Sequence, residues 1–213
     1  MITINLDKAE KNAEKLAEKK SSIKVLFSSL KIFLFKKNNV VRKILFISLE
    51  GFFAVHIATQ YETVICTREI LGVIMTIVIA LLAVVFTGYA LFQALMNDKL
   101  LVALLSVEKE ENGLIGTNDS FVELMIFQMT CVVIDLFVII FTHVIPSDWC
   151  MFVSNKLNIG ISGFLVFLLL HSNIEGIWEV TSFIFNIFQI FNLHAYSRIK
   201  EIVENNKTTE TKE

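Results

Sequence analysis

Residues 159–198 read IGISGFLVFLLLHSNIEGIWEVTSFIFNIFQIFNLHAYSR and contain no proline. As one continuous helix, these roughly 40 residues would extend for about 60 Å, twice the hydrocarbon thickness of a bilayer. The polar side chains recur at steps of three or four residues, so they share one helical face. These are His171, Glu175, Glu179, Ser182, Asn186 and Gln189. The stretch predicts a helix that crosses a membrane and continues into the cytoplasm with a polar seam.

The composition of the whole chain is that of an all-α, polytopic membrane protein. The 213 residues are 54% hydrophobic, with nineteen phenylalanines, one proline and a mean hydropathy of +0.64. Such a chain is too apolar for an ordinary soluble domain, and the scarcity of proline favours uninterrupted helices. We expect no nucleic-acid binding, because the basic N-terminal region mixes its lysines with Asp and Glu and contains no recognisable reader module.

Hydropathy predicts four membrane spans, at residues 44–64, 70–92, 121–145 and 159–181. The second span is the clearest, because its interior carries no ionisable group. We expect its helix to continue to about residue 107, and the fourth to about residue 200.

The two ends of the chain are polar and are expected to lie outside the membrane. Residues 1–21 predict a charged cytoplasmic helix and not a cleavable signal peptide, and residues 201–213 predict a disordered tail. Residues 22–37 place apolar side chains on one helical face and lysines on the other, which is typical of an amphipathic helix in the membrane interface. Packing of this helix against other cytoplasmic segments is the alternative.

The distribution of basic residues predicts the orientation. With the N-terminus inside, the inner segments hold every Lys and Arg except Arg68 and Lys156. This asymmetry is what the positive-inside rule requires. We therefore expect a multi-pass protein of the cell inner membrane with both termini in the cytoplasm and with membrane lipids as its surroundings.

Ionisable residues inside the predicted spans are the candidate functional residues. Charged groups in hydrocarbon cost a few kcal/mol each on insertion scales, so they seldom face lipid. The first interpretation is a neutral, hydrogen-bonded cluster that holds the bundle together, and the second is an ion or proton pathway. A metal site on His171 and Glu175 is the weakest interpretation, and we expect no metal. The intramembrane polar seam comprises Glu50, His56, Asp135, His171, Glu175 and Glu179.

Two further patterns concern packing and covalent structure. Small residues recur along one face of the second span, where they allow helix backbones to approach closely, either within one subunit, which we favour, or between subunits. They are Gly72, Thr76, Ala80, Ala83 and Thr87, followed by Ala90 and Ala94.

Cys66 and Cys150 both fall on the predicted outer side, and they could form a disulfide if that side is oxidising.

The sequence contains no catalytic signature: no G-x-S-x-G, no P-loop pattern and no C-x-x-C. We therefore expect neither an enzyme nor a cofactor. The predicted function is an oligomeric membrane scaffold or sensor that recruits or regulates a soluble cytoplasmic partner. The alternative is a homo-oligomeric ion channel or proton pathway through the polar seam.

In layout the chain resembles the small four-helix membrane subunits of bacterial antiphage defence systems, such as the membrane component of Kiwa. The resemblance covers the architecture of the whole chain, including the helix that leaves the membrane as GYALFQALMNDKLL, residues 88–101. It transfers no functional residue. It implies sensing of membrane perturbation, a homo-oligomer, for which we expect a tetramer, and a soluble effector partner in antiviral defence.

Overall fold

The computed structural model describes residues 6–34, 40–60, 62–106, 113–147, 149 and 154–210, with the backbone alone at 6, 99, 197, 201 and 204–210. Every regular element in these ranges is helical. The elements are α1 (Leu6–Ala17), α2 (Ser22–Ser29), the 3-10 helix η1 (Leu30–Phe33), α3 (Val40–Ala58), α4 (Thr63–Leu95), α5 (Asp98–Leu105), α6 (Leu114–Val144) and α7 (Asn155–Glu210).

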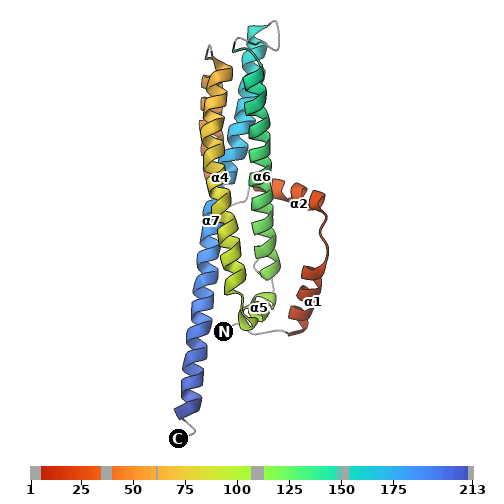
Figure 1. The fold of residues 1–213 in the computed structure, drawn as a ribbon, viewed down its shortest axis with the longest axis vertical. Helices are drawn as coiled ribbons and strands as arrows, with labels where there is room; N and C mark the ends of the chain where they lie inside the picture. The colour runs from red at the N-terminus through yellow and green to blue at the C-terminus, as the bar shows by residue number, and fades with distance from the viewer. Residues whose placement is uncertain are drawn as a thin grey trace.

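Three of these helices are long and apolar enough to cross a membrane: α4, α6 and the Asn155–Lys200 part of α7. They lie side by side along the long axis of the molecule (Figure 1). Of the four expected spans, the first corresponds to α3, which has 19 residues and carries Arg42, Lys43 and Glu50. At 1.5 Å per residue α3 is about 28 Å long, close to the thickness of a hydrocarbon core.

α7 is the longest element, with 56 residues, and would measure about 84 Å as a straight helix. It packs against α3, α4 and α6, and its C-terminal part extends below the other helices (Figure 1). Residues 201–210 are helical, which differs from the disordered tail expected from residue 201; residues 211–213 lie outside the described residues. No glycine or proline follows Gly176, so nothing in the sequence interrupts the helix.

α4 ends earlier than expected. The predicted continuation to residue 107 is wrong, because the helix stops at Leu95 and the backbone of Met96 and Asn97 is extended. The side-chain oxygen of Asn97 accepts a 2.8 Å hydrogen bond from the backbone N–H of Leu100. This N-cap starts the separate helix α5, which folds back against α1, α6 and α7.

In Figure 1, α1 lies beside the lower half of the bundle and α2 projects from its side at about mid-height. The expected 22–37 helix is α2 followed by η1, and residues 35–37 lie outside the described residues. α2 packs against α6, and η1 packs against α7. Asn12 of α1 donates a 2.7 Å hydrogen bond to the carbonyl oxygen of Leu105, and Lys20 forms an ion pair with Asp119 at the start of α6.

The larger hydrophobic core joins the lower parts of α4, α6 and α7 to α1 and α5. Three phenylalanine rings lie at its centre. The ring of Phe121 lies 5.1 Å from that of Phe92 and 4.8 Å from that of Phe183, both at steep angles. α4 fits against this ring stack at Gly88, where a Cβ atom would lie 2.7 Å from the Phe183 ring.

A smaller core lies in the upper half, between α3 and α7, and consists of Ala54, Ile57, Val166 and Leu170. Gly163 of α7 faces α3, and a Cβ atom there would lie 3.4 Å from the Cβ of Ala58. The two helices are antiparallel, and this close approach sets their register. Glu50 of α3 consequently lies opposite His171 of α7.

The small-residue stripe of α4 faces outward. Thr76, Ala80, Ala83 and Thr87 are exposed, and nothing lies within 4 Å of a Cβ built at Gly72. This differs from the favoured expectation that the stripe packs within one subunit. The hydroxyls of Thr76 and Thr87 donate to backbone carbonyls four residues earlier, at 2.9 Å each. The stripe therefore presents small side chains, and the hydroxyl groups of its two threonines already have hydrogen-bond acceptors.

Candidate functional site: a buried ionic cluster

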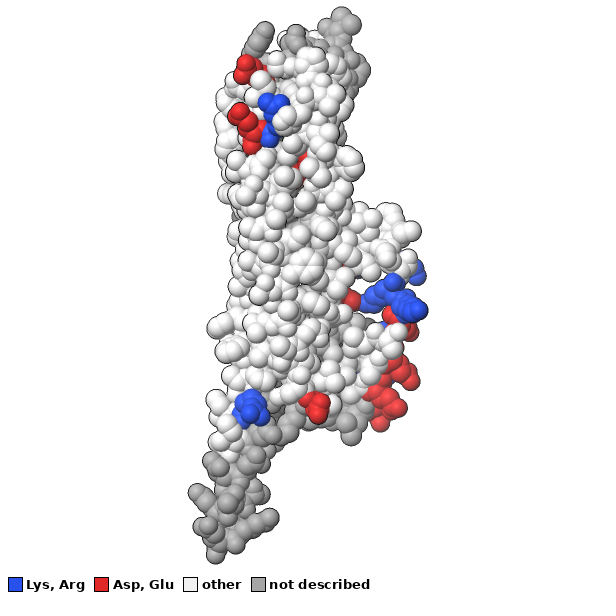
Figure 2. Space-filling view, in the orientation of Figure 1, with Lys and Arg blue, Asp and Glu red and all other residues white. Residues whose placement is uncertain are grey.

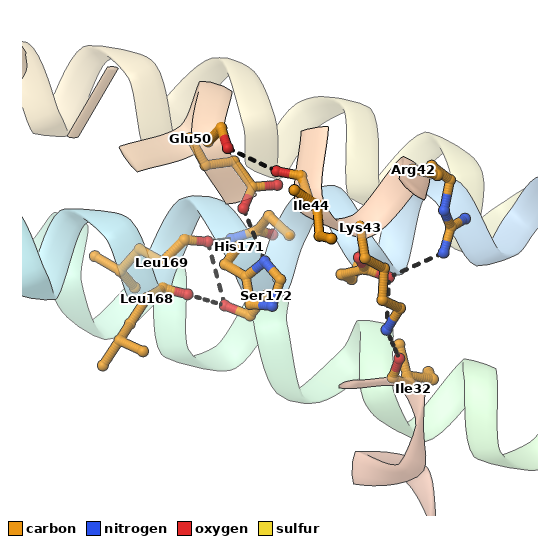
Figure 3. Close-up of polar contacts among 12 residues, drawn as sticks. Ile32, Arg42, Lys43, Ile44, Glu50, Leu168, Leu169, His171 and Ser172 are labelled. Carbon is orange, nitrogen blue, oxygen red and sulfur yellow. Dashed lines mark hydrogen bonds and ion pairs between the residues drawn. The ribbon is translucent and has the colours of Figure 1, made fainter. Parts of the chain in front are cut away.

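Three residues of the predicted polar seam, Glu50, His171 and Glu175, lie in a buried cluster where α3 packs against α7 (Figure 3). Nδ1 of His171 lies 2.8 Å from Oε2 of Glu50, and the Glu50 side chain is 2% exposed. The rings of Phe167 and Phe33 pack beside the imidazole, at 5.6 and 5.5 Å between centroids. Apolar rings therefore screen this hydrogen bond from its surroundings.

A second carboxylate in the cluster is paired with two cations. Oε2 of Glu175 lies 3.4 Å from Nζ of Lys43 and 3.5 Å from a guanidinium nitrogen of Arg42. The Glu175 side chain is fully buried, and that of Lys43 is 2% exposed. Lys43 also donates a 2.7 Å hydrogen bond to the backbone carbonyl of Ile32 in η1. The cluster thus joins α3, α7 and η1.

Arg42 is held mainly by aromatic faces. Its guanidinium carbon lies 4.8 Å from the ring centre of Trp178 and 6.0 Å from that of Phe46, and these two rings contact each other edge-on. Cation–π attraction strengthens when the cation is shielded from water. The arrangement keeps the positive charge against α7 and away from the outer surface of α3.

The cluster is bound by charge more than by hydrogen bonds. Both carboxylate oxygens of Glu175, Oε1 of Glu50 and the three Arg42 guanidinium nitrogens are buried without a hydrogen-bond partner among the described residues. Buried ion pairs of this kind rarely add net stability, but removal of one partner leaves an uncompensated charge and is strongly destabilising. The cluster is suited to fixing the position of α3 and η1 relative to α7.

Asp135 belongs to a different interface. It is fully buried between α6 and α7, where Nδ2 of Asn173 donates to Oδ1 of Asp135 at 3.1 Å and to the Leu169 carbonyl at 2.9 Å. Gln128, also buried, lies two turns earlier on α6 and contributes a second carboxamide to this interface. α7 therefore carries charged residues toward α3 and an amide toward α6.

The structure thus brings together Glu50, His171 and Glu175 and separates the other predicted members of the seam. Glu179 is half-buried one turn beyond Glu175. His56 is exposed, lies parallel to the Phe52 ring and contacts Gln60 at 3.3 Å, so it is not part of the cluster.

Four residues of the two interfaces escaped the sequence-based prediction: Arg42, Lys43, Gln128 and Asn173. Arg42 and Lys43 lie just before the predicted first span, residues 44–64, so the sequence assigns them to the basic inner side and gives them no partner. The available signal for Gln128 was its position seven residues before Asp135, which places both on one face of a helix.

Two other predictions concern thiols and metals. Cys150 lies outside the described residues, so its disulfide with Cys66 stays a prediction. In the part of the chain that the structure describes, no three His, Cys, Asp or Glu side chains lie close enough to hold a metal ion.

A cavity of about 300 Å³ lies in the lower half, between α1 and the lower ends of α4, α5 and α6. Its lining is mainly apolar and includes Ala13, Leu16, Met96, Leu101 and Leu105. This volume is at the lower limit of small-molecule sites. It could accept one or two apolar side chains.

The chain was compared with protein-family models, with curated proteins and with solved structures, and no match was found.

Proposed function

We propose that this protein is an oligomeric scaffold of the cell inner membrane that spans the bilayer four times and presents a helical cytoplasmic platform to a soluble partner protein. The observation that carries the proposal is the position of the larger hydrophobic core. That core lies below the N-terminal end of α3, around Phe92, Phe121 and Phe183. A protein that only needed to cross a bilayer would not need α1 and α5, which add buried side chains to the lower parts of α4, α6 and α7.

α3 is the span that this proposal adds to α4, α6 and α7. Its length matches the hydrocarbon core, and its charged side chains point toward α7, as intramembrane charges do. Its outward side chains are apolar and about half exposed or more. They are Ile44, Leu45, Leu49, Phe52, Phe53 and Val55. A bilayer at the level of α3 would surround these side chains with lipid.

The charge distribution supports an orientation with both termini inside. α1 and the C-terminal part of α7 lie at the same end of the molecule (Figure 1). On the face shown in Figure 2, charged residues gather near the upper end and along the lower half, with an uncharged surface between them. Of the Lys and Arg among the described residues, all except Arg68 and Lys156 belong to the N-terminal segments, the start of α3, α5 or the C-terminal part of α7.

Sister copies of the chain are the proposed occupants of an exposed apolar stripe on α7. The stripe follows steps of four and three residues, which is the spacing of parallel coiled-coil contacts. It consists of Ile184, Phe188, Phe191, Ala195, Ile199 and Ile202, all exposed except the half-buried Ala195. Membrane anchoring holds copies parallel and at high effective concentration. The outward small-residue stripe of α4 provides a matching contact surface within the bilayer.

In this proposal the ionic cluster holds the helices together and does not conduct ions. The ionisable residues are divided between two helix interfaces, and within each the carboxylates face groups that pair with them: His171, Lys43 and Arg42 in one, Asn173 in the other. A scaffold built this way could sense membrane perturbation and pass it to a bound effector, as the antiphage resemblance implies.

The oligomer is tested by light scattering on the detergent-purified protein. We expect a single oligomeric species for the wild type and a shift to monomer for Ile199→Asp with Ile202→Asp. Gln189→Asp, an exposed polar position on the same helix, is the matched control and should leave the oligomer intact. A monomeric wild type would overturn the oligomeric part of the proposal.

The scaffold is distinguished from a channel by ion flux in liposomes that contain the purified chain. We expect flux no higher than in empty liposomes. A soluble protein that co-purifies from native cells with the wild type and with Gln189→Asp, but not with the α7 double variant, would identify the partner. Ion flux that disappears in His171→Ala and Glu175→Ala would instead establish the channel.

A further inference from the structure

The α2–η1 segment projects sideways from the bundle near the level at which α3 begins (Figure 1). It presents bulky apolar side chains that no part of the described chain covers. Ile23 is 65% exposed, Phe27 is 67% exposed and Leu34, just after η1, is 62% exposed. Ile23, Phe27 and Leu30 follow steps of four and three residues and share one helical face.

Basic residues accompany this apolar face. Lys24 and Lys31 lie within the same segment and are exposed. In Figure 2 an uncharged lobe extends from the side of the molecule, with Lys and Arg just below it and Asp and Glu next to these. An apolar face bordered by lysines is the composition of a helix that lies in the interface of an anionic bilayer.

The segment is also bound directly into the ionic cluster. Its Ile32 carbonyl accepts the 2.7 Å hydrogen bond from Lys43, whose ammonium lies 3.4 Å from Glu175 of α7 (Figure 3). The neighbouring Phe33 ring packs on His171 of α7 and, at 5.4 Å, on Phe127 of α6. The buried side chain of Lys43 therefore contacts both η1 and α7.

We propose that α2–η1 binds the anionic inner surface of the bilayer and that Lys43 couples the position of this segment to α7. The inference rests on the proposed membrane placement of α3, which sets α2–η1 at the inner boundary of the hydrocarbon. If η1 moved away from the bundle, the buried ammonium of Lys43 would lose its carbonyl acceptor next to Glu175. α7 therefore responds when α2–η1 shifts on the lipid surface.

The lipid contact is tested with nitroxide labels on the full-length chain, with Cys66, Cys131 and Cys150 replaced, in vesicles of phosphatidylcholine with and without phosphatidylglycerol. A label at Phe27→Cys should collide several-fold more with oxygen, relative to a water-soluble nickel complex, than one at Glu14→Cys on the exposed face of α1. The difference should grow with phosphatidylglycerol. Equal nickel access at both positions would overturn the lipid contact.

A third label separates this inference from the proposed function. A label at Phe52→Cys, which is 66% exposed on α3, reports whether α3 lies in lipid. If this label is in water, the four-span placement fails. If it is in lipid while the Phe27→Cys label is in water, the α2–η1 inference alone fails.

The role of Lys43 is tested by the distance between labels at Phe27→Cys and Gln189→Cys, measured by electron–electron double resonance. With Lys43 present, we expect a narrow distribution that shifts when phosphatidylglycerol is added. Lys43→Met should broaden it and abolish the shift, whereas Lys43→Arg, which keeps a buried cationic donor, should retain the shift. A distribution unchanged by Lys43→Met would overturn the coupling.

Discussion

His171 and Glu50 meet across the α3–α7 interface, with Nδ1 2.8 Å from Oε2, although 121 residues of sequence separate them. One group of the pair must carry the proton that the two share, because a carboxylate has no donor of its own. The contact joins the shortest of the four proposed spans to the longest helix. It lies eight residues along each helix from the close contact of Gly163 with Ala58, which sets the register of the two helices.

Removing one member of this pair should destabilise the protein more than removing both. We expect Glu50→Leu or His171→Leu alone to cost about 3 kcal/mol, because each leaves a buried polar partner unmatched. The double variant should recover most of the loss, since it replaces the pair by apolar groups. Thermal unfolding of the four proteins in one detergent measures the coupling. Additive losses would show that the pair does not interact.

Asp135 should tolerate conversion to its amide. Asp135→Asn keeps an acceptor for Asn173 and removes a buried carboxyl, so we expect an unfolding temperature equal to or above that of the wild type. Asn173→Asp removes the donor and places two carboxyls together in an apolar site, and it should lower the unfolding temperature sharply. A loss of equal size in both variants would contradict Asn173 as the donor and Asp135 as the acceptor of this hydrogen bond.

The prediction from sequence succeeded where the signal was local. Hydropathy located α4, α6 and the membrane part of α7, and helical periodicity placed His171 and Glu175 on one face. Depth along a helix does not say which neighbour a side chain faces, so Asp135 was grouped with His171 although it faces Asn173. The positive-inside rule counts Arg42 and Lys43 without assigning them a partner, and so the ion pairs with Glu175 were missed.

The early end of α4 had a readable signal in Asn97 followed by Asp98, a good N-cap and first-turn residue. The continuous apolar pattern around Leu100 concealed it. The continuation of α7 through residues 201–210 was missed for the opposite reason. Its polar composition is typical of disorder, yet it directly follows a long helix with no breaker between them.

Gly88 should not tolerate a methyl group. An alanine Cβ there would lie 2.7 Å from the Phe183 ring, which is itself held against Phe121 at 4.8 Å. We expect Gly88→Ala to cost about 1–3 kcal/mol through overpacking. Gly51→Ala is the matched control, because nothing lies within 4 Å of its Cβ. It should be neutral or slightly stabilising in the same unfolding assay, and a Gly88→Ala protein as stable as this control would contradict the close packing.

Asn12 should hold α1 against α5. Asn12→Ala removes the buried hydrogen bond to the Leu105 carbonyl and leaves that acceptor unmatched. We expect faster hydrogen exchange across α1 and earlier cleavage there by a protease, with the membrane helices unchanged. Lys20→Ala is the control, since the partly exposed ion pair with Asp119 contributes at most about 1 kcal/mol. Identical exchange in the two variants would contradict this assignment.

The uninterrupted course of α7 has a mechanical consequence. From Glu179, one turn below the ionic cluster, to Glu210 the helix extends for about 46 Å. A tilt of about 10° at the level of the cluster would displace the far end by about 8 Å, more than one helical turn. A rearrangement too small to open an ion path through the bundle would therefore displace the C-terminal end of α7 by a distance comparable to the width of a helix.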